Sequence, residues 1–197
     1  MADIQKTAEN LQKLGYTVKL CATAAEAADY LESQIRDTTV GLGGSMTLKD
    51  LGIYERLCAH NTVSWHWEQG PEARGEAAKA KVYLSSANRL AETGEIVNID
   101  GGGNRVASTL YGHEKVYFVI GRNKIAQDYE GALWRARNIA APKNAQRLGC
   151  KTPCAVKGDR CYDCKGPGRI CRGLVVLWGP MMAVEMEVVL VDEDLGY

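Results

Sequence analysis

Short apolar segments alternate with helix-like segments along most of this chain, and this alternation restricts the possible folds more than any other feature. The segment 115–120, KVYFVI, is the best candidate for a buried strand. Similar short strands are expected at 16–21, 39–42, 62–65, 82–85 and 95–99. Helices are expected at 4–14, 23–35, 72–81, 104–111 and 128–140. Strands that alternate with helices predict an α/β fold, with a mostly parallel sheet that helices cover on both faces.

The C-terminal part is predicted to depart from this alternation. Segments 174–178 and 187–191 are expected to form a closing antiparallel hairpin at the edge of the sheet. Pro142 is expected to end the helix 128–140, because proline cannot donate a backbone hydrogen bond. The 197 residues contain no internal repeat and no linker-like stretch. A single domain over 1–197 is therefore predicted.

Composition excludes several classes of function. Lys and Arg number 24, as do Asp and Glu, so the formal net charge is zero. A nucleic-acid or membrane-surface partner attracted by bulk charge is not expected. The N-terminus lacks the continuous apolar core of a signal peptide, and no stretch is long enough for a membrane span. A reducing cytoplasm is the expected compartment.

Cysteines are crowded into one segment near the C-terminus. Five of the seven lie within 22 residues, in the stretch CKTPCAVKGDRCYDCKGPGRIC. We call residues 150–171 the cysteine segment. Its glycines and prolines predict a turning loop instead of a helix or strand. Four thiolates at these separations can converge on one soft metal centre, which would order a loop that has little apolar surface to bury. The predicted ligands are Cys154, Cys161, Cys164 and Cys171, and Cys150 is expected to be a spare.

Several kinds of site could use such a cluster. A disulfide framework suits small secreted domains, which this chain does not resemble. Zinc sites more often show two close CxxC pairs, and only Cys161 and Cys164 form one here. Iron–sulfur clusters accept looser spacing, so a [4Fe–4S] cluster is the first expectation, zinc the alternative and metal-free cysteines the third.

Two glycine-rich loops are expected at the carboxyl ends of strands, where open α/β sheets bind ligands. The first runs over residues 40–47, VGLGGSMT, between a strand and a helix. Glycines let backbone N–H groups approach an anion, and hydroxyl groups can add donors. The alternative is a tight turn with a helix cap. Its candidate ligand-binding residues are Gly41, Gly43, Gly44, Ser45 and Thr47.

The second loop runs over residues 99–105, IDGGGNR, and also opens a helix. Val106 occupies the place of the third glycine of a dinucleotide fingerprint, so that motif is not supported. Asp100 could act as a base, or could only cap the helix, and Arg105 could fork a carboxylate or phosphate. Asp100 and Arg105 are therefore the catalytic candidates. The loop residues expected to bind a ligand are Gly101, Gly102, Gly103 and Asn104.

Weaker signals lie elsewhere. Arg122 and Lys124 follow the strand 115–120, so both could reach an anion at the same sheet edge, although a solvated surface would explain them equally well. His66 lies between two tryptophans and fits a packing role better than a catalytic one.

Taken together, GLGGSMTLKDLGI, SANRLAETGEIVNIDGGGNRVASTLYG, VIGRNKI and RNIAAPKNAQRL resemble the lactate-utilisation (LUD) domain family, from about residue 40 to the end. The resemblance implies the fold shared by ribose-5-phosphate isomerase, glucosamine-6-phosphate deaminase and CoA transferases. In that fold a GxGxxS/T-type loop binds phosphate or CoA, and Gly41, Gly43, Gly44 and Ser45 match it. Acidic residues near a DG-containing loop do chemistry there, and Asp100 matches them loosely.

The resemblance also implies a function. Some LUD members belong to an iron–sulfur enzyme system that oxidises L-lactate to pyruvate. The TPCxxxGxxCxxC block resembles a short, single-domain branch. We therefore expect a protein with one iron–sulfur cluster and a small anionic ligand, a carboxylate or phosphate, near Gly43, Ser45 and Asp100.

Two other functions also fit the sequence. The first is a cofactor-free isomerase or CoA-transferase-like enzyme with a structural zinc loop, dependent on Asp100 or Glu95. The second is a non-catalytic partner subunit that docks another protein through its cysteines. The expected macromolecular partners are a second copy of the chain or a redox protein.

Overall fold

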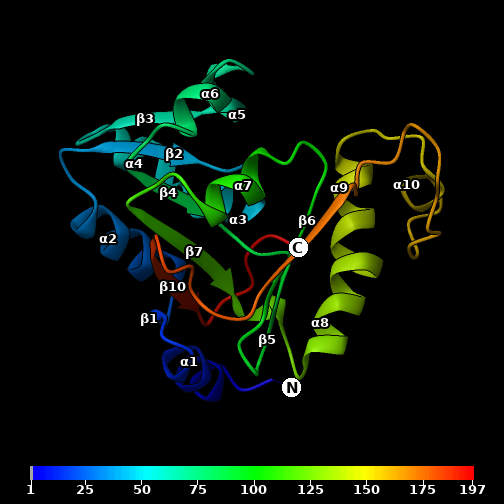
Figure 1. The fold of residues 1–197 in the computed structure, drawn as a ribbon, viewed down its shortest axis with the longest axis horizontal. Coiled ribbons are helices and arrows are strands. Elements are labelled where there is room, and N and C mark those ends of the chain that lie inside the picture. The colour runs from blue at the N-terminus through cyan, green and yellow to red at the C-terminus, as the bar shows by residue number, and fades with distance from the viewer. Residues whose placement is uncertain (1) are drawn as a thin grey trace.

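A six-stranded parallel sheet forms the centre of the molecule, in the order β1-β10-β7-β4-β2-β3 (Figure 1). It is seen in a computed structural model that describes residues 2–197, so residue 1 of the predicted domain lies outside the described residues. The strands are β1 (Thr17–Cys21), β2 (Thr39–Leu42), β3 (Thr62–Trp65), β4 (Val82–Ser85), β7 (Lys115–Gly121) and β10 (Glu185–Val191). The predicted parallel α/β sheet is confirmed.

Side chains on successive positions of these strands enter two different cores. In β7, Tyr117 and Val119 join one core, while Val116, Phe118 and Ile120 join the other. The first core is covered by α2 (Ala24–Gln34), α3 (Met46–Asp50) and α4 (Ile53–Cys58). The second is covered by α1 (Ile4–Lys13), α6 (Ala73–Ala77) and a smaller sheet. Burial on both faces explains the continuous apolar run of β7.

The smaller sheet contains four strands in the order β8-β5-β6-β9. They are β5 (Arg89–Ala91), β6 (Ile96–Asp100), β8 (Ile125–Ala126) and β9 (Gly173–Leu177). The prediction of a C-terminal hairpin is wrong, because β9 pairs antiparallel with β6 whereas β10 lies between β1 and β7 in the large sheet. Residues 186–191 of β10 are all buried, as expected for a central parallel strand, while Leu174 of β9 is exposed.

One long helical run crosses the smaller sheet and leads to the cysteines (Figure 1). It consists of α8 (Tyr129–Arg135), a π-helical turn over Ala136–Ala140 and α9 (Ala141–Arg147). Pro142 does not end this helix as predicted. It lies in the first turn of α9, directly after the wide π turn, where a proline is tolerated.

Short helices complete the chain. They are α5 (His66–Gln69), α7 (Asn104–Leu110), the 3-10 turn Arg122–Lys124 and α10 (Pro153–Lys157). The last one corrects the prediction that the cysteine segment has no helix, because Pro153 starts a turn that contains Cys154. None of the helices in residues 2–197 has both the length and the apolar character needed to cross a lipid bilayer.

Candidate anion pocket and cysteine site

The two glycine-rich loops meet at the carboxyl edge of the sheets, as the sequence predicts, and together line a cavity of about 560 Å³. We call this cavity the anion pocket. Gly44 comes from the loop after β2, and Asp100, Gly101 and Gly102 come from the loop after β6. A smaller cavity of about 90 Å³, which we call the inner chamber, shares Gly44 and Arg105 with it and also contains Ser45 and Lys124.

Asp100 caps the helix that follows it. Its Oδ1 accepts hydrogen bonds from the backbone N–H groups of Gly102 and Gly103, both at 3.1 Å, and its Oδ2 accepts one from Val106 at 3.2 Å. Asp100 Oδ2 also lies 3.6 Å from Arg105 Nε. The sequence leaves two roles open for Asp100, a base or a helix cap, and these hydrogen bonds are those of a helix cap. These contacts already occupy both carboxylate oxygens of Asp100.

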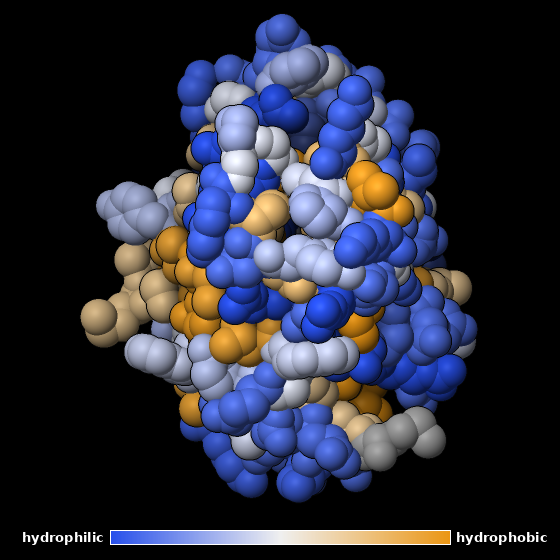
Figure 2. All heavy atoms as spheres, turned by 90° about the vertical axis from the view of Figure 1, so that its right-hand side faces the viewer, coloured by the Kyte–Doolittle hydropathy of each residue, from blue (hydrophilic) through white to orange (hydrophobic). Residues whose placement is uncertain are grey.

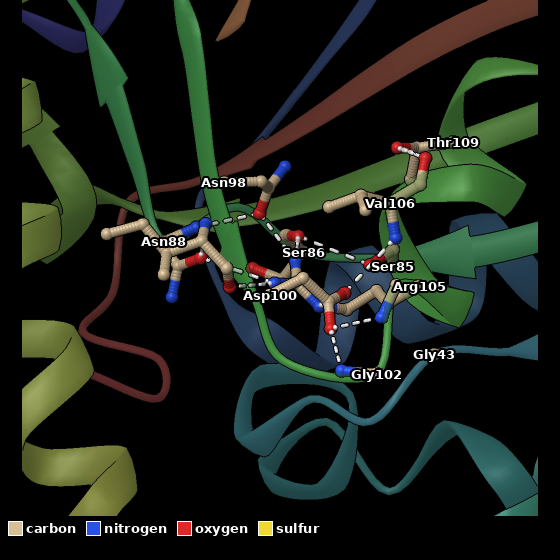
Figure 3. Close-up of polar contacts among 12 residues, drawn as sticks. Gly43, Ser85, Ser86, Asn88, Asn98, Asp100, Gly102, Arg105, Val106 and Thr109 are labelled. Atoms are coloured by element: carbon tan, nitrogen blue, oxygen red, sulfur yellow. Dashed lines mark hydrogen bonds and ion pairs between the residues drawn. The ribbon is translucent and has the colours of Figure 1, made fainter. Parts of the chain in front are cut away.

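Arg105 ties the strand ends together (Figure 3). Its guanidinium donates to the backbone carbonyl groups of Ser86 and Ile99 and to the side-chain oxygens of Asn88 and Asn98. Burial lowers the pKa of this group, and Asp100 opposes that shift. With four hydrogen bonds and an ion pair, the guanidinium is directed at the protein and has no free fork for a ligand. The ligand-binding role predicted for Arg105 does not fit this geometry.

Lys124 lies at the inner chamber and is almost fully buried, with 4% of its surface exposed. Its Nζ donates to Thr47 Oγ1 at 2.7 Å, to Ser86 Oγ at 3.0 Å and to the carbonyl oxygen of Ala87 at 3.2 Å. Burial, with the nearby cations Arg89 and Arg105, lowers the pKa of Lys124 to about 7. The structure thus places an ammonium group, with only neutral acceptors, beside a cavity.

Ser45 and Thr47 have different positions in the first loop. Ser45 lines the chamber, and its Oγ accepts a hydrogen bond from the N–H of Leu48 as the cap of α3. Thr47 is fully buried behind the chamber, where it holds Lys124 and donates to the carbonyl oxygen of Leu195. Both the cap and the ligand-contact alternatives therefore remain compatible with Ser45.

Two of the predicted ligand glycines serve close packing. A Cβ on Gly41 would lie 2.3 Å from the carbonyl oxygen of Ala77 in α6. A Cβ on Gly101 would lie 2.4 Å from the carbonyl oxygen of Ile170. Gly101 therefore allows the cysteine segment to pass directly over the pocket loop.

The remaining predicted site residues divide clearly. Asn104 lines the pocket. Gly43 is not in the lining, and a Cβ on it would lie 2.9 Å from Tyr83 Oη and 3.1 Å from Ser85 Oγ. Gly103 has the left-handed φ of 83° that starts α7. Arg122 is exposed and forms ion pairs with Asp192 and Asp194 at 3.5 and 3.1 Å. Lys124 is inside the chamber, whereas its neighbour Arg122 lines neither cavity.

Sequence reasoning missed most of the rim of the pocket. The additional lining residues with charged or aromatic side chains are Trp67, Arg74, Arg147, Arg169 and Arg172. Arg147 lies over the Trp67 ring, 4.8 Å from its centroid, and donates to Tyr197 Oη. His66 also lines the pocket, and burial lowers its pKa. The concentration of arginines after residue 134 was the available signal, but only the fold shows that they face the glycine loops.

All four predicted metal ligands line one small enclosed cavity beneath the cysteine segment. Cys154, Cys161, Cys164 and Cys171 contribute to its wall, together with Arg137, and Cys150 does not. The four thiols are half-buried. The N–H of Asp163 donates to Cys161 Sγ at 3.3 Å, and Thr152 Oγ1 lies 3.3 Å from Cys154 Sγ. Within residues 2–197, however, no three His, Cys, Asp or Glu side chains are close enough together to hold a single metal ion.

Cations surround this thiol cavity. Asp163 forms ion pairs with Arg137, Lys165 and Arg169 at 3.4, 2.8 and 3.2 Å. The nearby Cys171 is the main cause of a raised pKa of Arg169. Figure 2 views the side of the molecule that carries α8, α9 and α10. Hydrophilic residues cover most of this side, and apolar residues form a larger patch and several smaller ones. These surroundings fit a site that carries negative charge on its sulfur atoms.

The thiol cavity and the anion pocket are neighbours. Cys171 and Ile170 line both, and the pocket is also lined by Arg169 of the cysteine segment and by Arg172 directly after it. A group held by the four cysteines would therefore lie beside a ligand in the pocket.

Comparison with known proteins agrees with this architecture. A family model described as "LUD domain" matches residues 4–191. An uncharacterized protein of Escherichia coli (strain K12), YkgG, is 40% identical over 78 residues, which are 39% of this chain and 34% of that protein, so the match spans about a third of its length. The crystal structure of a DUF162 family protein from Deinococcus radiodurans has a TM-score of 0.56 at 15% identity, over 95% of both chains.

Proposed function

Because this chain belongs to the LUD domain family, we propose that it is a lactate-utilisation-type protein that holds an iron–sulfur cluster beside an anion pocket. The observation that carries this proposal is the convergence of Cys154, Cys161, Cys164 and Cys171 on one cavity that shares Cys171 with the pocket. The ligand in the pocket would be a 2-hydroxy acid or a related anion. The compartment would be a reducing one, in which the thiols stay available.

The donor set fits a cluster better than a single zinc ion. Zinc needs all its thiolates within about 2.3 Å of one centre, and the cysteines of residues 2–197 do not gather that closely. In a cluster each thiolate binds its own iron atom, so the sulfur atoms can stand farther apart. The backbone N–H donated to Cys161 Sγ is one of the contacts that tune such clusters. When bound, the cluster would supply one-electron transfer.

The chain's own residues would bind and orient the anion. The charge of Lys124 can attract an oxyanion into the inner chamber, although its three N–H donors already bind Thr47, Ser86 and Ala87. Arg105 keeps the strand ends in place around the chamber. Two electrons and two protons leave a 2-hydroxy acid when it becomes a 2-oxo acid. The proposal therefore includes an electron-accepting redox protein as partner.

Metal analysis of protein purified without oxygen tests the proposal. We expect about four iron and four sulfide per chain, with a broad absorbance band near about 400 nm. Cys161→Ser and Cys171→Ser should each remove most of the iron. Cys58→Ser changes an exposed cysteine outside the segment and is the matched control. One zinc without sulfide, or equal iron in all three variants, would contradict the proposal.

A further inference from the structure

Lys124 is a buried cation without an anionic partner. Its three hydrogen bonds all go to neutral oxygens, and no Asp or Glu of residues 2–197 forms an ion pair with it. The charged groups that act on Lys124 are two further cations, Arg89 and Arg105, and one acid, Asp50, whose effect is the smallest of the three. An ammonium buried without a counter-charge is costly, and a bound anion in the adjoining chamber would offset that cost.

The chamber adjoins a much larger cavity, with which it shares lining residues that include Gly44, Arg105 and Arg147. Its volume of about 90 Å³ suits one carboxylate or phosphate group, or a molecule as small as lactate with its six non-hydrogen atoms. The anion pocket adds about 560 Å³ on the outer side. Pockets of this size commonly enclose ligands much larger than lactate.

The wall of the larger cavity is cationic. Arg74, Arg147 and Arg172 line it, and none of them forms an ion pair with a carboxylate in residues 2–197. Among the residues that the structure describes, Asp100 is the only acid in the lining, and its oxygens are already occupied by the helix cap and by Arg105. The positive charge therefore extends from Lys124 to the cysteine segment, to which Arg172 is adjacent.

We propose that the pocket binds an elongated polyanion larger than a free hydroxy acid. A terminal phosphate or carboxylate occupies the inner chamber at Lys124, and a second anionic group lies at the arginines of the outer rim. The inference deepens the proposed function, on which it rests for the identity of the pocket as the substrate site. The substrate class becomes an anion with two separated charged ends.

Calorimetric titration of the full-length protein tests this, with four probes: L-lactate, inorganic phosphate, ADP and glutarate. ADP ends in a phosphate and glutarate ends in a carboxylate. The probe that binds more tightly therefore identifies the end group that the chamber prefers. We expect at least one of them to bind at least tenfold more tightly than lactate and phosphate. Lactate binding as tightly as both longer probes would overturn the proposal.

Two variants locate the charged ends. Lys124→Met should weaken every probe by at least tenfold, while Arg172→Gln should weaken the longer probes and leave phosphate unchanged. Lys79→Met is the control, because Lys79 is exposed, pairs with Glu76 and lines neither cavity. Unchanged affinities in both Lys124→Met and Arg172→Gln would sink the proposal, and Arg172→Gln keeps the test valid if Lys124→Met does not fold.

The same samples separate this proposal from the one on which it rests. Iron and sulfide are measured before each titration, and the titrations are repeated after the metal has been removed. Tight binding of a long anion without iron would leave the polyanion site standing and remove the cluster. A full cluster with no preference for the longer probes would support the cluster and rule out the polyanion site.

Discussion

The anion pocket and the cysteine segment lie side by side, but different interactions hold them in place. The pocket is backed by strand ends from both sheets and by the buried contacts of Arg105. In the cysteine segment only Thr152 is buried, and the ion pairs centre on the exposed Asp163. The strand-end wall of the pocket should therefore keep its shape when empty. The cysteine segment, which lines the pocket through residues 167–171, should depend for its order on the proposed cluster.

The distribution of charge also distinguishes residues 134–172, which include the cysteine segment, from the rest of the chain. Residues 134–172 contain ten Lys and Arg against two Asp and Glu, a formal charge of +8, and the rest contains 14 against 22, a charge of −8. The neutral total of the whole chain conceals this separation. A cluster with four thiolate ligands is negative, so it would be placed in the part of the chain that can balance it.

The largest effect is expected when the internal support of the pocket is removed. Arg105→Met leaves Asp100 without its cation and leaves buried carbonyl groups without donors, so the free energy of unfolding should fall by about 3–5 kcal/mol. Chemical denaturation measures this value. A loss below about 1 kcal/mol would show that the pocket does not depend on this network.

Removal of the proposed cluster should produce the next largest effect, and only in the cysteine segment. We expect amide exchange in residues 150–171 to speed up by about 100-fold, which corresponds to about 2.7 kcal/mol, because few buried contacts remain to protect it. The strands β7 and β10 should keep their protection. Hydrogen-exchange mass spectrometry before and after chelation checks this, and equal changes in both regions would refute the contrast.

A smaller effect is expected from pH. The pKa of Lys124 is about 7 in the folded chain, so its charge is present below pH 7 and is lost above it. Sulfate keeps its charge over this range, and its affinity should fall by up to tenfold per pH unit between about pH 7 and 9. In the free protein the sign is opposite: Lys124 has a higher pKa when unfolded, so its contribution to stability rises between about pH 7 and 10.4. Lys124→Met should abolish both trends.

The sequence predicts the position of the pocket because local rules decide it. Strands followed by glycine-rich loops place Gly44 and Gly101 at the carboxyl ends of β2 and β6, and both line the pocket although the two strands belong to different sheets. The four cysteines were likewise found from their crowding alone, and they line one cavity. Non-local contacts were not predictable. Arg147 reaches Trp67 from 80 positions away, and β10 enters the sheet between β1 and β7 although its neighbour β9 joins another sheet.

The smallest effect on stability should come from substitution of Arg122. The sequence analysis predicts Arg122 and Lys124 at the same sheet edge, as two cations that could reach one anion. The 3-10 turn Arg122–Lys124 points the two side chains to different surroundings, Arg122 to the exposed Asp192 and Asp194 and Lys124 to the buried Thr47. Exposed ion pairs contribute little, so Arg122→Ala should lower the free energy of unfolding by less than about 1 kcal/mol. It should also leave the affinity for ADP and glutarate unchanged. A clear loss of anion affinity in Arg122→Ala would mean that the ligand extends beyond the pocket to the outer face of this turn.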